Sequence, residues 1–528
     1  RERRDELMGS AFEILGELRR LRVAERAASG LNTELLDTAF ASFVRSFDAK
    51  NGGFGGAPKF PAAMSMEFLL RYWKRTGNEN ALSIVKHTAE KMAKGGIYDQ
   101  LGGGFHRYAV DAIWLVPHFE KMHYDNAQLI RIYLHLYQIT RDEFFRRIAE
   151  ETLEYVRREM IGSEGGFYST QDADSEGEEG KFFVWSPEEI VEILGEDDAR
   201  AFCLYYDISA EGNFEGHNIP NIKNAPEDTA KALGISKEDL AAAVERSREK
   251  LFAEREKRIK PFRDEKILTA WNGLMLAAFA EAAAVLGKDE YLAVARANAD
   301  FLLSELVSEG RVLRTWKDGR AKLNGYIEDY ANLADGLLEL YQVSGETRYF
   351  TEARRLAEMM ITEFWDEENG GFFFTSNDHE ELIVRNKDFN DNATPSGNSV
   401  AADVLIKLAK FTGEEKYERF AMTVRRLMSG QIRRFPNGFG RALATLEFAL
   451  GETKEVALVG DDLSQLAAEL WREYRPLKVV AVAGEMAGND VPLLEGRAPV
   501  DGKAAAYVCE GFVCKRPVTS PQELAELL

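Results

Sequence analysis

The sequence predicts a mainly α-helical protein: an (α/α)6 barrel, in which six helical hairpins form a closed toroid, with a small C-terminal α/β appendage. Amphipathic segments with a period near 3.6 residues follow one another in pairs from about residue 31 to 450. A glycine-aromatic motif returns between the pairs, mostly at intervals of roughly 50–70 residues. Each unit must bury its apolar face against its neighbours. An open helical-repeat scaffold satisfies the same pattern and remains the alternative.

Five helix pairs are clear, and about six hairpins fit this region. The pairs are 64–76 with 81–94, 117–140 with 142–160, 269–286 with 290–307, 328–343 with 347–364, and 397–411 with 415–428. The motif occurs as GGFGG (52–56), GGGFHRY (102–108), EGGFYST (164–170), EGRVLRT (309–315), NGGFFFT (369–375) and NGFGRAL (437–443). These turns favour closure, because they suit chains that crowd around one central funnel.

The flanking segments differ from the repeats. Residues 1–30 predict a charged linker helix, and a divergent insert occupies about 186–262. From 451 to 528, short β-branched or apolar runs at 455–460, 477–484 and 504–514 predict strands, with a helix at 463–474. We therefore divide the chain into a linker (1–30), a barrel domain (31–450) and a small α/β domain (451–528).

Composition restricts the partners and the compartment. A formal charge of −21 disfavours nucleic acid and anionic membranes, and no apolar run approaches the roughly 20 residues of a membrane helix. Cys203, Cys509 and Cys514 are too few for a disulfide framework, which favours the cytoplasm. Cys509 and Cys514 match neither a CxxC motif nor a zinc half-site, so their spacing gives little support to a redox role. No phosphate-binding or dinucleotide motif predicts a cofactor.

The densest group of candidate site residues lies in GGIYDQLGGGFHRYAVDAIWLVPHFEKMHYDNAQL (95–129). Its glycines let the backbone approach a ligand closely, and we expect Pro117 to open a helix. A zinc site is disfavoured, because His118 and His123 would be separated by about 140° around that helix. The candidates in this stretch are His106, Arg107, Trp114, His118, Glu120 and Asp125.

A second candidate is the acidic segment STQDADSEGEEGKFFVW (169–185). In an extended segment Asp172 and Asp174 would point the same way, about 7 Å apart. Such pairs serve acid/base chemistry or calcium binding, but no EF-hand loop is present. Gln171 precedes the pair and Trp185 follows it, and an aromatic near carboxylates is typical of sugar binding. A solvated acidic turn is the alternative.

Polar groups recur at the start of three later predicted helices. Helix capping explains a single Ser or Asp at such a position, but not the combination of tryptophan, amides and paired acids. Polar residues and tryptophans around one barrel mouth predict a carbohydrate site. The residues are Lys266, Trp271 and Asn272; Glu328 and Asp329; and Asp391, Asn392, Ser396 and Asn398.

These motifs, with IEDYANLADGLLELY, ATPSGNSVAADVL and the tail AYVCEGFVCKRPVTSPQEL, resemble the YyaL group of thioredoxin-domain-containing proteins, which includes the spermatogenesis-associated protein 20 type. The resemblance spans essentially the whole chain. It implies a six-hairpin glycosidase-like toroid related to sugar 2-epimerases and glycoside hydrolases. It also implies a preceding thioredoxin-like domain, and because the sequence begins in the helix that usually follows that domain, we expect it to be absent here.

The sequence thus leads to three hypotheses. The first is a carbohydrate-processing enzyme, a glycoside hydrolase with Asp172 and Asp174 as catalytic acids, followed by Glu120, Asp125 and Glu328. The second is a sugar 2-epimerase that uses histidines among His106, His118 and His217. The third is a non-catalytic module that binds a glycan or a thioredoxin-like partner, which a mouth filled by its own salt bridges would favour. The substrate-binding residues are predicted to be His106, Arg107, Trp114, His118, Gln171, Trp185, Lys266, Trp271, Asn272, Asp329, Asn392, Ser396 and Asn398, with no metal.

Overall fold

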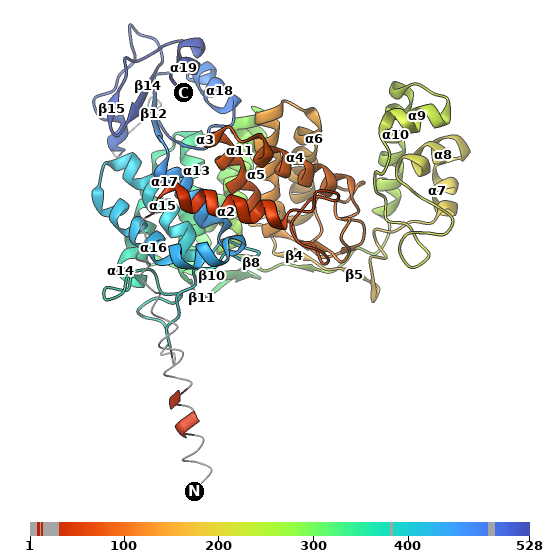
Figure 1. The fold of residues 1–528 in the computed structure, drawn as a ribbon, viewed down its shortest axis with the longest axis horizontal. Coiled ribbons are helices and arrows are strands. Elements are labelled where there is room, and N and C mark those ends of the chain that lie inside the picture. The colour runs from red at the N-terminus through yellow and green to blue at the C-terminus, as the bar shows by residue number, and fades with distance from the viewer. Residues whose placement is uncertain (1–7, 11, 14–30, 381–383, 484–490) are drawn as a thin grey trace.

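The computed structural model describes residues 8–10, 12–13, 31–380, 384–483 and 491–528 (Figure 1). Most of the predicted linker helix at 1–30 lies outside the described residues.

Six inner helices form a closed ring. Each contacts the next one along the chain, and the last contacts the first, so the ring closes without an open end. The (α/α)6 toroid is therefore confirmed, and the open scaffold is excluded. The inner helices are α3 (Ala63–Thr76), α5 (His123–Thr140), α11 (Thr269–Leu286), α13 (Ile327–Ser344), α15 (Gly397–Thr412) and α17 (Gly440–Leu450).

Outer helices pack around this ring. Five of them follow their inner partner directly along the chain: α4 (Glu79–Lys94), α6 (Glu143–Tyr155), α12 (Asp289–Glu305), α14 (Thr347–Phe364) and α16 (Glu415–Arg434). The sixth is α2 (Thr33–Ser46), which contacts α16 and α17 from the other end of the sequence. The sixth hairpin is thus completed by the tertiary structure rather than by neighbouring segments.

The two ends of the toroid differ in their connections. In five hairpins, a connection of two residues joins the inner helix to the outer helix that follows it. The first of these is a left-handed glycine in four cases, because a helix that must reverse at once needs a positive φ. The long connections, with the glycine-aromatic turns, all lie at the opposite end, where every inner helix begins. The left-handed glycines of the short connections are Gly77, Gly287, Gly345 and Gly413.

Short strands join the long connections. The predicted helix at 117–140 begins only at His123, because its first part pairs as strands, which corrects the helical placement of His118 and Glu120. The small sheets are β1 (Tyr108–Ala109) with β2 (Pro117–His118); β3 (Lys121–Met122), β4 (Thr170–Gln171) and β7 (Arg263–Asp264); β5 (Asp174–Ser175) with β6 (Glu178–Glu179); and β8 (Ile267–Leu268), β9 (Val307–Ser308), β10 (Arg311–Lys317) and β11 (Arg320–Asn324).

Three glycine-aromatic turns contain the same buried ion pair. In each, an Asp carboxylate accepts backbone N–H groups of its own turn and pairs with a lysine from further along the chain. The lysine also donates to a glycine carbonyl of the turn, so the turn is closed from inside. The pairs are Asp48–Lys59 at 2.5 Å, Asp99–Lys121 at 2.8 Å and Asp366–Lys387 at 2.7 Å.

A buried asparagine fastens three of the turns to the inner helices. In each case its Oδ1 accepts from the backbone N–H of the turn phenylalanine, and its Nδ2 donates to the carbonyl of that same residue. Because both ends of the amide are occupied, the prediction that Asn272 and Asn398 bind substrate is wrong. The pairs are Asn126 with Phe105, Asn272 with Phe167, and Asn398 with Phe372.

A four-stranded sheet covers the short-connection end of the toroid. Its order is β13-β12-β14-β15, and α18 (Ser464–Arg472) and α19 (Pro521–Leu527) pack on one face of it. The other face packs on the toroid. The end of α18 also reaches the toroid, where Gln138 Nε2 donates to the Trp471 carbonyl at 2.7 Å. One end of the toroid is thereby closed. The strands are β12 (Lys454–Val459), β13 (Lys478–Ala483), β14 (Ala505–Glu510) and β15 (Val513–Cys514).

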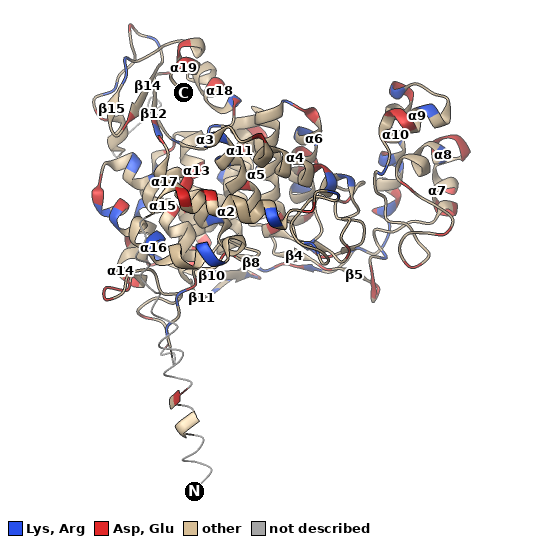
Figure 2. Cartoon of the chain, viewed as in Figure 1, with Lys and Arg blue, Asp and Glu red and all other residues tan. Residues whose placement is uncertain are grey.

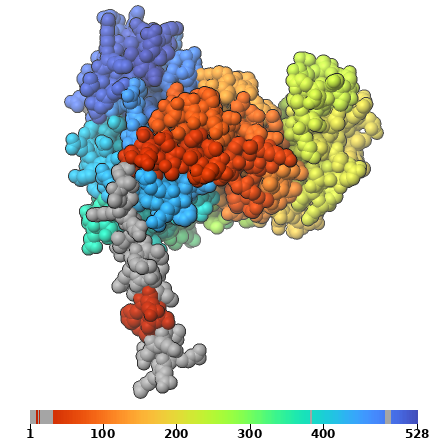
Figure 3. All heavy atoms as spheres, in the orientation of Figure 1, coloured from red at the N-terminus to blue at the C-terminus, as the bar shows by residue number. Residues whose placement is uncertain are grey.

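The insert between α6 and α11 forms a helical unit with a hydrophobic cluster of its own. It stands beside the toroid in the space-filling view (Figure 3). Arg255 reaches from its last helix to the turn carboxylate of Asp99, with two bonds of 2.8 and 3.0 Å. The helices are α7 (Pro187–Leu194), α8 (Glu196–Tyr205), α9 (Pro226–Leu233) and α10 (Lys237–Arg255).

By length and composition alone, α11 could cross a membrane, but 78% of its 18-residue window is buried inside the protein. It lies between α5 and α13 as an inner helix of the toroid.

We expect Asn272→Ala to lower the free energy of unfolding by about 2–4 kcal/mol, because it leaves a buried backbone N–H and carbonyl without their partner. Urea denaturation measures this. Asn332 is a matched control on α13: it is equally buried, its Oδ1 has no hydrogen-bond partner, and its Nδ2 makes one bond. Asn332→Ala should cost clearly less, and equal losses would contradict the proposed clamp.

Candidate functional site

A cavity of about 380 Å³ opens at the long-connection end of the toroid. Its wall combines the start of α3, the first turns of α5, the segment 391–393 and the start of α17. Polar segments that are far apart in the sequence therefore share one hollow, which we call the mouth cavity. Its polar lining residues are Ser65, Arg107, Tyr124, Asp125, Gln128, Asp391, Asn392 and Asn437.

Asp125 places a buried carboxyl group in the mouth cavity. The residue is 7% exposed, and its Oδ2 has no hydrogen-bond partner. Burial raises the pKa of Asp125 well above its usual value, and the attraction of Arg107 offsets this only in part. The protonated form is thereby favoured. Arg107 itself pairs with Glu120, with Nη1 and Oε2 3.0 Å apart.

Asp391 is a second carboxyl group in the same cavity, in a different environment. It accepts from the backbone N–H of Ser396 at 2.9 Å and from those of Arg441 and Ala442 at 2.8 and 3.2 Å. Burial raises the pKa of Asp391 to about 6, while these N–H groups act to lower it. At pH 7 its ionised form is favoured, so the cavity holds two carboxyl groups in different protonation environments.

Aromatic rings flank the polar groups. Phe60 lines the cavity and is 54% exposed, and its ring stacks on Tyr108 with centroids 4.7 Å apart. Trp271 packs edge-on against Tyr124 at 4.7 Å, behind the cavity wall. Trp271 itself does not line the cavity.

Below the mouth cavity, the axis of the toroid is filled by paired charges. His135 lies between two carboxylates, with Nδ1 2.7 Å from Glu67 and Nε2 2.8 Å from Glu281. Burial alone would lower the pKa of His135, but the charges of Glu281 and Glu67 raise it to about 9. The imidazole is therefore charged at neutral pH and belongs to a salt-bridge network.

The same network continues across the axis to α13, α15 and α17. Lys407 lies 2.7 Å from Asp335, and Arg441 lies 2.8 Å from Asp335 and 2.5 Å from Asp403. A cavity of only about 50 Å³ remains between these groups and the mouth. Within the toroid, the mouth cavity therefore offers more space for a ligand than the region below it.

Three predicted ligand-binding residues are packed inside the protein instead. Trp114 is fully buried and donates its indole N–H to the Asn51 carbonyl at 3.0 Å. Trp185 is also fully buried, beneath the guanidinium of Arg258. His106 bonds the Phe119 carbonyl through Nδ1, and burial together with the charge of Lys121 lowers its pKa to about 3. None of these three side chains reaches the mouth cavity.

The predicted acid pair also lies elsewhere. Asp172 and Asp174 are exposed and line neither the mouth cavity nor the second cleft, which is about 980 Å³ and lies between the β5–β6 hairpin and the insert. His118 stands at the edge of this cleft with Nδ1 2.7 Å from Glu179. The segment is extended as predicted, but it projects to solvent, away from the residues that converge at the mouth.

The remaining predicted residues hold the long connections together. Glu328 pairs with Arg314 at 2.7 Å, and burial raises the pKa of Asp329 to about 7 while it accepts from the backbone of Ala270 and Tyr326. The others are Gln171, which accepts from Tyr155; Lys266, which pairs with Asp264; and Ser396, which caps α15. Of the residues that the sequence assigned a catalytic or substrate-binding role, Arg107, Asp125 and Asn392 line the mouth cavity, and so does Asp391, which was noted without such a role.

Sequence reasoning missed Phe60, Tyr124, Gln128 and Asn437, and it left Asp391 out of the site although it noted the residue. Tyr124 directly precedes Asp125 on α5 and Gln128 follows it by three residues, close to one helical turn, so the position of Asp125 was an available signal. Phe60 carries no local motif, and Asn437 opens the NGFGRAL turn without any signal that would assign its side chain to the site. They reach the cavity because α17 packs against α3.

The fold and the mouth cavity define an (α/α)6 toroid protein with a polar, partly aromatic pocket at the start of its inner helices. No family model matches the chain. The chain is 34% identical to human "Spermatogenesis-associated protein 20" over 93% of its own length and 68% of that protein. It is 30% identical to "Uncharacterized protein B0495.5" from Caenorhabditis elegans, over 95% and 75%. The chain belongs to the spermatogenesis-associated protein 20 family.

Solved structures resemble the chain more distantly. An unsaturated glucuronyl hydrolase specific for heparin is 10% identical, covers 79% of this chain and 95% of its own, and gives a TM-score of 0.48. The GH76 α-mannanase BT2949 of Bacteroides thetaiotaomicron is 8% identical over 79% and 94%, with a TM-score of 0.47. A sugar epimerase from a ruminal bacterium is 16% identical over 78% and 98%, with a TM-score of 0.34.

The axis network predicts a specific pH dependence of stability. Because the folded-state pKa of His135 is raised to about 9 from 6.5, its stabilising contribution is complete below about pH 6.5 and is lost as the pH rises through about 9. We expect a loss on the order of 3 kcal/mol between pH 6 and 10, seen in urea unfolding.

In His135→Gln this component of the pH dependence should disappear, and the protein should be less stable at pH 6. His217→Gln, which changes an exposed histidine of the insert, should keep the normal profile. An unchanged profile in His135→Gln would show that the imidazole is not charged in the folded protein.

Proposed function

We propose that the protein binds a sugar or glycan in the mouth cavity and acts on it as a glycoside hydrolase, with Asp125 as the general acid. The observation that carries the proposal is the Asp125 carboxyl group, which belongs to a residue that lines the open polar cavity and has a buried oxygen, Oδ2, without a hydrogen-bond partner. A carboxyl group kept protonated by burial is suited to protonate a leaving oxygen.

The lining of the cavity supports a carbohydrate ligand. Sugars present hydroxyl groups at their rim and apolar C–H groups on their ring faces, so they require both polar side chains and an exposed ring. The cavity offers Asn392, Asn437 and Gln128 beside the exposed ring of Phe60. Its volume of about 380 Å³ lies within the roughly 300–1,000 Å³ of small-molecule sites.

Asp391 is the second carboxyl group of the proposal. It lines the same cavity and keeps its charge at neutral pH, because backbone N–H groups offset the effect of burial. Glycoside hydrolysis uses one ionised and one protonated carboxyl group in the same site, with the ionised group activating water or stabilising the positive charge of the transition state.

The epimerase hypothesis lacks a pair of histidines in the cavity. His106 is buried, His118 pairs with Glu179, and His217 lines the second cleft, so none of the three lines the mouth cavity. A non-catalytic binding module is the second candidate, because the axis is filled by the protein's own salt bridges. Such a module would bind a glycan, or a thioredoxin-like partner, without turnover.

The test is hydrolysis of a panel of aryl glycosides and labelled oligosaccharides by wild type and Asp125→Asn. On substrates with poor leaving groups, the variant should be about 10²- to 10⁴-fold slower, because the leaving oxygen is no longer protonated. It should recover much of the rate on dinitrophenyl glycosides, which leave without a proton. Wild-type activity should fall as the pH rises through the raised pKa of Asp125, and the variant should lack this limb.

Asp172→Asn and Asp174→Asn are the matched controls, since they change exposed carboxylates outside the cavity. They should retain full activity. Activity that depends on them and not on Asp125 would contradict the assignment. Deuterium incorporation at C2 of the recovered sugar in D₂O would favour epimerisation. Glycan binding without turnover would favour the binding module.

A further inference from the structure

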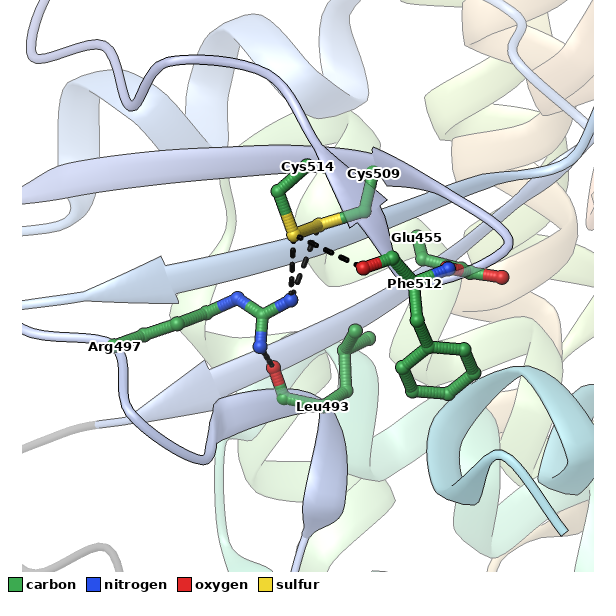
Figure 4. Close-up of a disulfide and its surroundings, with 6 residues drawn as sticks. All are labelled: Glu455, Leu493, Arg497, Cys509, Phe512 and Cys514. Carbon is green, nitrogen blue, oxygen red and sulfur yellow. Dashed lines mark hydrogen bonds between the residues drawn. A yellow bond between two sulfur atoms is a disulfide. The ribbon is translucent and has the colours of Figure 1, made fainter.

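A disulfide joins Cys509 and Cys514 at the edge of the C-terminal sheet (Figure 4). The two cysteines lie opposite each other on β14 and β15, which are joined by a turn at Gly511 and Phe512, both with positive φ. The third cysteine, Cys203, is free and lies in the insert. The spacing of Cys509 and Cys514 matched no redox motif in the sequence, and their pairing comes from the register of the hairpin.

A guanidinium group is directed at both sulfur atoms. Arg497 Nη2 lies 3.1 Å from Cys509 Sγ and 2.9 Å from Cys514 Sγ. The same guanidinium donates through Nη1 to the Leu493 carbonyl, which fixes its position (Figure 4). A neutral disulfide has little need of a cation, whereas a thiolate is stabilised by one. The position of Arg497 therefore fits the reduced state of the pair.

The two sulfur atoms differ in access. Cys509 is 1% exposed, because β14 is covered by its neighbours, whereas Cys514 on the edge strand is exposed. A reductant from solvent can reach only the Cys514 sulfur. The buried Cys509 sulfur is then the leaving group, and it leaves next to Arg497.

The hairpin is held together by contacts other than the disulfide. The backbone N–H of Phe512 donates to the buried carboxylate of Glu455 at 2.6 Å, and the Phe512 ring lies against Gly413 at the end of α15. The disulfide closes a loop with a sequence separation of only 5, so it constrains the unfolded chain little. The thiols would stay opposite each other after reduction, which permits re-oxidation.

From these contacts we propose that Cys509–Cys514 is a reversible thiol–disulfide exchange site for a dithiol reductant. A thiolate of the dithiol attacks Cys514 Sγ, the Cys509–Cys514 bond breaks, and its electron pair leaves on Cys509 as a thiolate beside Arg497. The second thiol of the reductant, as a thiolate, then attacks the reductant sulfur that is bonded to Cys514 Sγ, and Cys514 leaves as a thiolate. The protein disulfide gains two electrons, the dithiol becomes a disulfide, and its two protons pass to the cysteine pair.

The test is reduction of the folded full chain by dithiothreitol, followed by alkylation in denaturant and mass measurement. The oxidised chain should carry one alkyl group, on Cys203, and the reduced chain three. Oxidised dithiothreitol should return the count to one. Arg497→Gln should lower the rate of reduction at pH 7 about tenfold, because the leaving thiolate loses its cation, and Arg497→Lys should restore part of the rate.

Arg516→Gln is the matched control: it removes an exposed cation two residues from Cys514 that, within the described part of the chain, has no hydrogen bond to either sulfur, and it should leave the rate unchanged. Circular dichroism checks that the variants are folded. Three alkyl groups on the chain after oxidation, resistance of the folded chain to dithiothreitol, or an unchanged rate in Arg497→Gln would each overturn the proposal.

Discussion

The structure depends on the pairing of charged side chains along the axis of the toroid. Charges removed from water are costly unless they are paired and hydrogen-bonded. His135 on α5 is paired with carboxylates from α3 and α11. Lys407 on α15 and Arg441 on α17 are paired with carboxylates from α13 and α15. These pairs form only when the six inner helices stand in one register around the ring. A closed ring and a neutralised axis therefore require each other. Lysines and arginines are interspersed with acidic residues over the helices (Figure 2).

This constraint also decides where a ligand can bind. The paired charges occupy the middle of the toroid, and the C-terminal sheet covers its short-connection end. The long connections gather at the other end, where asparagine clamps and Asp–Lys pairs hold their turns against the inner helices. The mouth cavity is what remains open. It combines a rim held by these contacts with the buried carboxyl group of Asp125, so the site is built on fixed elements rather than on free loops.

The two proposed chemistries lie on opposite ends of the toroid. Asp125 stands in the first turn of α5 at the mouth, whereas the cysteine hairpin contacts Gly413 at the far end of α15. Nothing in the exchange reaction uses the mouth cavity, and nothing in the proposed hydrolysis uses the disulfide. Each proposal can fail without affecting the other.

The sequence by itself determined the helical hairpins, the glycine-aromatic turns and the toroid, because apolar periodicity and turn residues act over a few neighbouring positions. Three of its candidate site residues, Arg107, Asp125 and Asn392, lie next to these local signals and line the mouth cavity. The tertiary structure decided the contacts between distant segments, which local periodicity does not specify. It completed the sixth hairpin with α2, brought Phe60 and Asn437 to the mouth through the packing of α17 on α3, and sent Asp172 and Asp174 to solvent. It also converted Asn272 and Asn398 from candidate ligands into clamps and paired Cys509 with Cys514. In each case the deciding contact joins segments whose meeting depends on ring closure, backbone register or packing.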